Sequence, residues 1–125
     1  MNFEELRENV EKWAEDKDLL YSKNADKQFM KFVEEMFEFK AEMDIWKLYK
    51  KIKHDENIEQ DFSIEEVERW KNLKLEMGDI FVTLIILCNQ LGIDCVECLQ
   101  LAYEKISKRK GKTIDGTFVK EADLK

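Results

Sequence analysis

The chain has 125 residues, a length that fits one small domain. Hydrophobic residues make up 44% of it, which is enough for a core, and charged residues make up 39%. Its formal net charge of -7 at pH 7 argues against a nucleic-acid partner bound non-specifically through the phosphate backbone. The longest strongly apolar run, residues 80–88, has about half the length of a membrane span, so no membrane partner is expected either.

Two helices are predicted in the first half of the chain by apolar residues at three- and four-residue spacings. The first covers about residues 2–16, and a polar stretch at 22–26 follows it. The second covers about residues 27–53, and we expect a loop at residues 54–62 after it. The absence of proline and the presence of only four glycines favour such long helices.

Two further helices are predicted in the second half. One covers about residues 64–90, and its apolar stretch at 80–88 is hydrophobic nearly all round, which predicts the most buried helix of the fold. The other covers about residues 95–110, with Asp94 as its N-cap. Residues 112–125 are polar and are expected to form a C-terminal tail.

Together these elements predict an all-α fold, a four-helix bundle in a single domain over residues 1–125 with its core at about 25–111. Long amphipathic helices in so short a chain leave apolar surface uncovered, so a homodimer or homotetramer is expected to complete the burial. Three cysteines and an acidic N-terminus without a signal-peptide pattern predict free thiols in a reducing cytoplasm.

Two acidic clusters stand out, with the spacings Glu34-Glu35-x-x-Glu38 and Glu76-x-x-Asp79. Residues three apart lie side by side on one face of a helix, so each cluster presents two carboxylates to one point. Both clusters border apolar faces, and packing of those faces would bring the two pairs together. Such carboxylates repel each other and lose hydration, which favours a bound cation, and an all-oxygen site suits Mg²⁺ or Mn²⁺.

Acidic pairs are also common on solvated helix faces. In that alternative the chain is a non-catalytic helical interaction or regulatory protein, and the acidic clusters are only part of its surface. The border with apolar faces favours a site instead. Gly78 favours it too, because a glycine inside a helix costs about 1 kcal/mol relative to alanine. We therefore expect Gly78 to mark the close approach of a helix or a ligand.

On these residues the sequence resembles the MazG-like family of all-α nucleoside triphosphate pyrophosphohydrolases, which carries both acidic motifs in the same order. The resemblance covers about residues 25–120, including a basic end of the last predicted helix at 105–112 and a tail similar to those of small, often phage-borne members. It implies a bundle of the MazG-like type. It also implies Mg²⁺-dependent hydrolysis of (deoxy)nucleoside triphosphates to monophosphate and pyrophosphate, as housekeeping of the nucleotide pool.

The resemblance also implies roles for individual residues. The implied metal ligands are Glu35, Glu38, Glu76 and Asp79. Glu34 joins Glu35 and Glu38 as a catalytic residue and would help to orient the attacking water. The implied contacts to the substrate phosphates are Lys105, Lys108 and Arg109. Trp46, which helical spacing places near the acidic arc of the second helix, is the expected stacking partner of the base.

Overall fold

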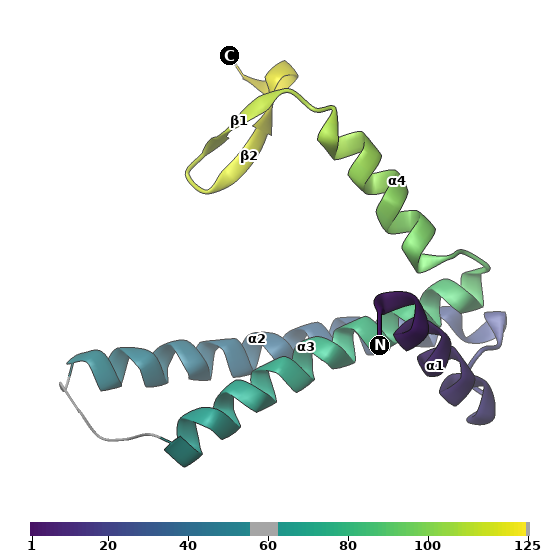
Figure 1. Cartoon of the computed structure of the whole chain (residues 1–125), viewed down its shortest axis with the longest axis horizontal. Helices are drawn as coiled ribbons and strands as arrows, with labels where there is room; N and C mark the ends of the chain where they lie inside the picture. The colour runs from purple at the N-terminus through teal and green to yellow at the C-terminus, as the bar shows by residue number, and fades with distance from the viewer. Residues whose placement is uncertain (56–62, 125) are drawn as a thin grey trace. The chain divides into compact units, whose positions relative to one another are not determined.

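The computed structural model describes residues 1–55 and 63–124, most of which are helical (Figure 1). The helices are α1 (Phe3–Asp16), α2 (Ala25–Asp55), α3 (Ser63–Leu91) and α4 (Cys95–Ser107), with short 3-10 turns at Ser22–Asn24 and Glu121–Asp123. The strands are β1 (Gly111–Ile114) and β2 (Thr117–Lys120). The predicted all-α character is therefore confirmed for the bulk of the chain, and the C-terminal hairpin is an addition to it.

The chain forms two compact units, Met1–Gly92 and Ile93–Lys125, where the sequence predicts a single domain. In the first unit α2 and α3 lie side by side as two long antiparallel helices, and α1 packs against α3 (Figure 1). Of the six buried side chains among the described residues, four belong to α3, which agrees with the prediction that this is the most buried helix: Thr83, Ile85, Ile86 and Gln90. The four-helix arrangement stays a prediction, because α4 belongs to the second unit.

Two glutamine side chains, one buried and one partly buried, set the register between the elements of the first unit. Gln28 Nε2 donates to the carbonyl oxygen of Thr83 at 3.2 Å and so ties α2 to α3. Gln90 Nε2 donates to the carbonyl oxygen of Leu19 at 2.8 Å and so ties α3 to the segment between α1 and α2. Because a buried amide is costly without such partners, these bonds favour one alignment of the helices over its neighbours.

The ends of the first three helices agree with the prediction to within about two residues, which is the usual uncertainty of helix ends. Asn2 caps α1 by accepting a hydrogen bond from the backbone N–H of Glu5 at 2.9 Å. The loop expected at residues 54–62 is wrong at its start, because His54 and Asp55 continue α2. The rest of that loop, residues 56–62, lies outside the described residues.

The second unit begins with the predicted cap and ends with a structure that was not predicted. Asp94 accepts hydrogen bonds from the backbone N–H groups of Val96 and Glu97 at 2.8 and 3.2 Å. The expected polar tail is wrong, because β1 pairs with β2 in antiparallel register. The chain reverses at Asp115 and Gly116, whose φ angles of 50° and 78° suit a two-residue hairpin turn.

Two smaller expectations concern the chain's chemistry and its relation to membranes. Cys88, Cys95 and Cys98 form no disulfide among the residues that the structure describes. Within residues 1–55 and 63–124, no single helix is both long enough and apolar enough to cross a membrane.

Candidate metal centre

Three of the predicted ligand carboxylates converge between the two long helices. One oxygen each of Glu35, Glu38 and Glu76 lies within 4.8 Å of the other two. Glu35 and Glu38 are one turn apart on α2, and Glu76 faces them from α3. Glu35 is only 7% exposed, Glu76 is half-buried and Glu38 is exposed, so the cluster has a buried side and a side open to solvent.

Two oxygens of this cluster lack the partners that buried carboxylates require. Glu35 Oε2 and Glu76 Oε2 are buried, and neither has a hydrogen-bond partner in the part of the chain that the structure describes. Burial of an unpartnered charged oxygen is costly, and a cation relieves the cost by direct coordination. The donor set consists of oxygens alone, so it fits a hard divalent ion such as Mg²⁺ or Mn²⁺.

The cluster changes the acidity of its members. The pKa of Glu38 is raised, first by a hydrogen bond with the Glu35 carboxyl group and then by the charge of Glu35. The pKa of Glu76 is raised, first by burial and then by the charges of Asp79 and Glu35. Both shifts show that the fully ionised cluster is unfavourable without a cation.

Lys31 supplies a positive charge beside the cluster. Its Nζ lies 3.3 Å from Glu35 Oε1 and 3.5 Å from Glu34 Oε2. These two carboxylates raise the pKa of Lys31, with the hydrogen bond to Glu35 as the largest cause. Sequence reasoning missed this residue, although a lysine four positions before Glu35 lies on the same helix face and signals the pairing.

We expect the metal-free protein to lose stability as the pH rises from about 5 to 7. The folded-state pKa values of Glu38 and Glu76 lie above the ordinary value of 4.5, so the folded state binds more protons than the unfolded state in this window. Glu66 has a lowered pKa, caused by hydrogen bonds from Lys50 and Lys53, and its contribution is lost only as the pH falls below 4.5.

Urea denaturation in EDTA across this pH range measures how the free energy of unfolding changes with pH. Glu76→Gln should flatten this dependence, whereas Glu68→Gln, at an exposed position on the same helix, should leave it unchanged. A wild-type stability that rises with pH across the same window would contradict the prediction.

The fourth predicted ligand, Asp79, is not part of the close cluster. It is exposed and lines a cavity of about 390 Å³ with residues of α1, among them Val10 and Trp13. Three residues turn a helix by about 300°, so Asp79 is rotated from Glu76 toward α1. Its charge still acts on Glu76, whose pKa it helps to raise.

Glycine 78 does not mark a close helix contact. A Cβ atom built at Gly78 would meet no atom within 4 Å among the residues that the structure places. The expected approach of a neighbouring helix is therefore wrong for this part of the chain, and the approach of a ligand stays a prediction. Two residues turn a helix by about 200°, so Gly78 points away from the side of α3 that carries Glu76.

The remaining predicted site residues lie apart from the cluster or in the second unit. Glu34 is exposed and is held by Lys31. Lys105 lies in the last turn of α4, and Lys108 and Arg109 follow this helix, so all three predicted phosphate contacts belong to the second unit.

Trp46 contacts aromatic and cationic groups rather than the carboxylates. Its ring centroid lies 5.2 Å from that of Trp70 and 6.2 Å from that of Tyr49, and Lys50 Nζ lies 5.0 Å from the Trp46 ring. Eight residues separate it from Glu38 on α2, which corresponds to about 12 Å along the helix axis. Trp46, Lys50 and Trp70 line a cavity of about 340 Å³ with two other residues. A base contact at Trp46 stays a prediction.

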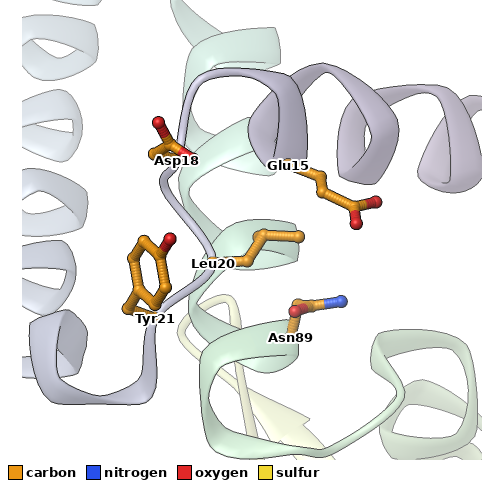
Figure 2. A pocket seen from close by; sticks show the side chains of 5 residues that line it. All are labelled: Glu15, Asp18, Leu20, Tyr21 and Asn89. Atoms are coloured by element: carbon orange, nitrogen blue, oxygen red, sulfur yellow. The ribbon is translucent and has the colours of Figure 1, made fainter.

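A further cavity of about 510 Å³ lies where α1, the following segment and α3 meet, and Figure 2 shows its lining: Glu15, Asp18, Leu20, Tyr21 and Asn89. Glu15, Leu20 and Asn89 extend to one side of the connecting segment in this view. Thirteen residues separate Asn89 from Glu76, or about 20 Å along α3. This cavity is therefore distinct from the acidic cluster, and none of its lining side chains has a buried oxygen or nitrogen without a partner.

Comparisons of the chain with protein-family models, with curated proteins and with solved structures give no match. The fold and the cluster define the class of the protein: it is predominantly helical and carries a candidate carboxylate metal centre between two long helices. The resemblance to the MazG-like family stays a prediction that rests on the two acidic motifs.

Proposed function

We propose that this chain hydrolyses (deoxy)nucleoside triphosphates to monophosphate and pyrophosphate with the help of Mg²⁺. The observation that supports this proposal is the convergence of Glu35, Glu38 and Glu76 from two helices, with two buried oxygens that lack partners. These three carboxylates would hold the ion, and Asp79, whose charge already acts on Glu76, is the proposed fourth ligand. A bound Mg²⁺ or Mn²⁺ would neutralise phosphate charge and acidify water.

The proposed role of each acidic residue follows from how buried its side chain is. Glu35 is fixed by burial and by Lys31, so it anchors the centre. Glu38 is exposed, so it would hold the ion on the side of the cluster that water reaches, and the proton of the water that attacks the α-phosphorus would pass to solvent. Glu34, beside it on the exposed side, orients that water. The new oxygen–phosphorus bond forms as the bond between the α-phosphorus and the bridging oxygen breaks, and pyrophosphate leaves.

Binding of the rest of the nucleotide is assigned to residues outside the cluster. Lys105, Lys108 and Arg109 are the proposed phosphate contacts, because a protein with a net charge of -7 needs local cations to hold a triphosphate. Trp46 is the proposed stacking partner of the base. Its neighbour Trp70 lies within ring-contact distance and would form the second wall of such a site.

Self-association is the second part of the proposal. Several large apolar side chains of α2 and α4 are exposed, including Met30, Phe37, Leu48, Leu99 and Tyr103. Exposed apolar residues in this number favour an interface between copies of the chain, because burial of each apolar side chain would stabilise the assembly. We propose a homodimer or homotetramer in the cytoplasm, in which a partner copy supplies some of the basic contacts.

The proposal is tested by incubating the full chain with ribo- and deoxyribonucleoside triphosphates and Mg²⁺. Pyrophosphate, measured separately from orthophosphate, should appear with at least one nucleotide, because attack at the α-phosphorus releases the two outer phosphates together. Mg²⁺ alone should also raise the melting temperature, by an amount that corresponds to about 2.7 kcal/mol when its concentration is a hundred times its Kd.

Two results would contradict the hydrolase. Orthophosphate without pyrophosphate would place the attack at the terminal phosphorus. No product from any nucleotide, together with a melting temperature that Mg²⁺ and Mn²⁺ leave unchanged, would favour the alternative of a non-catalytic helical interaction or regulatory protein.

A further inference from the structure

Lys31 has a position that the proposed hydrolysis does not itself require. Its ammonium group pairs with Glu35 Oε1 at 3.3 Å, while the other oxygen of the same carboxylate is buried and lacks a hydrogen-bond partner among the residues described. The Lys31 side chain is 50% exposed, whereas that of Glu35 is 10% exposed. A half-exposed cation at the open edge of the cluster thus contacts an acid that is buried.

We propose that Lys31 is a built-in counter-ion that makes the centre bind a metal–phosphate complex in preference to the free metal ion. The inference rests on the proposed function of the cluster as a metal centre. A fixed positive charge beside Glu35 repels an incoming divalent cation and lowers the affinity for the ion alone. A phosphate group that arrives with the ion brings negative charge and reverses this penalty.

The charges near the cluster support this preference. When ionised, the three carboxylates of the cluster together with Glu34 and Asp79 carry five negative charges, and Lys31 offsets one of them. One divalent ion offsets two more, so the positive charge of Lys31 limits the repulsion between the remaining carboxylates and the phosphates. Because the Lys31 side chain is long and half exposed, its ammonium group can leave Glu34 and donate to a phosphate oxygen near the ion. Lys31 would thereby select ligands that carry both a divalent cation and a phosphate.

Isothermal titration of the full chain with two probes tests the proposal: Mn²⁺ alone, and a preformed complex of Mn²⁺ with pyrophosphate. The wild type should bind the complex more tightly than the ion. Lys31→Met should bind Mn²⁺ alone roughly three- to tenfold more tightly and should bind the complex more weakly by a similar factor. Opposite changes for the two probes cannot come from a general loss of structure, which would weaken both.

Two control variants test whether the effect depends on a positive charge at position 31 or only on the net charge of the chain. Lys31→Arg keeps the charge and should stay within about twofold of the wild type for both probes. Lys40→Met removes the same charge from the same helix, where Lys40 pairs with Asp44 at 2.6 Å and is 57% exposed. We expect Lys40→Met to leave both affinities unchanged, and circular dichroism should show that each variant keeps its helices.

The possible outcomes distinguish this inference from the proposed function. If Lys31→Met weakens both probes, Lys31 merely supports Glu35, and the inference is wrong although the metal centre stands. Equal changes in Lys31→Met and Lys40→Met would attribute the effect to net charge and would also overturn it. If no protein, including the wild type, binds Mn²⁺, the metal centre itself is refuted, and the role of Lys31 with it.

Discussion

Glu76→Gln should reduce Mg²⁺-dependent pyrophosphate release by at least about a hundredfold while leaving the helices intact. Glu76 is the one member of the close cluster that α3 provides, and its Oε2 is buried without a partner. Glutamine has the same shape but no charge, and its amide nitrogen cannot coordinate a cation. The loss should appear in kcat as well as in the Mg²⁺ concentration needed for half-maximal rate, measured by coupled detection of pyrophosphate.

A matched control and a structural readout accompany this variant. Glu68→Gln makes the same substitution at an exposed position of α3, eight residues before Glu76, and should stay within about twofold of the wild-type rate. In EDTA, Glu76→Gln should be more stable than the wild type at neutral pH, because burial and neighbouring charges raise the pKa of Glu76. Wild-type turnover with an unchanged Mg²⁺ dependence in Glu76→Gln would refute the centre.

Ile86→Ala should lower the free energy of unfolding by about 3 kcal/mol and the melting temperature by roughly 10 °C. Ile86 is 4% exposed and lies in the apolar second half of α3, where the described core is concentrated. Removal of its outer carbons leaves a cavity that the surrounding helices fill only in part. Urea denaturation monitored by circular dichroism measures the change.

Val67→Ala is the control for the core variant. Val67 lies near the start of the same helix and is 63% exposed, so its truncation should cost less than about 0.5 kcal/mol. Equal losses from the two variants would contradict the assignment of the core to the second half of α3. They would show instead that the start of this helix is buried as deeply in solution, as an interface between copies of the chain would require.

Local features of the fold were predictable because they depend on residues close together in the chain. Apolar spacing predicts each of the four helices, and Asp94 caps α4 as expected, because its side chain reaches the backbone N–H groups two and three residues ahead. The hairpin β1–β2 was missed because its strands are four residues each and almost wholly exposed, so they lack an apolar alternation. The dipeptide Asp115-Gly116, which is typical of a two-residue hairpin turn, was the feature of the sequence that could have predicted it.

By itself, the sequence determined which carboxylates share a helix face, because backbone hydrogen bonds fix the rotation at about 100° per residue. The tertiary structure alone decided which of these faces meet. It brings Glu76 to Glu35 and Glu38, turns Asp79 toward α1, and places Trp46 against Trp70. The alignment of two helices depends on contacts between residues far apart in sequence, such as the hydrogen bond from Gln28 to Thr83, and no spacing within one helix encodes it.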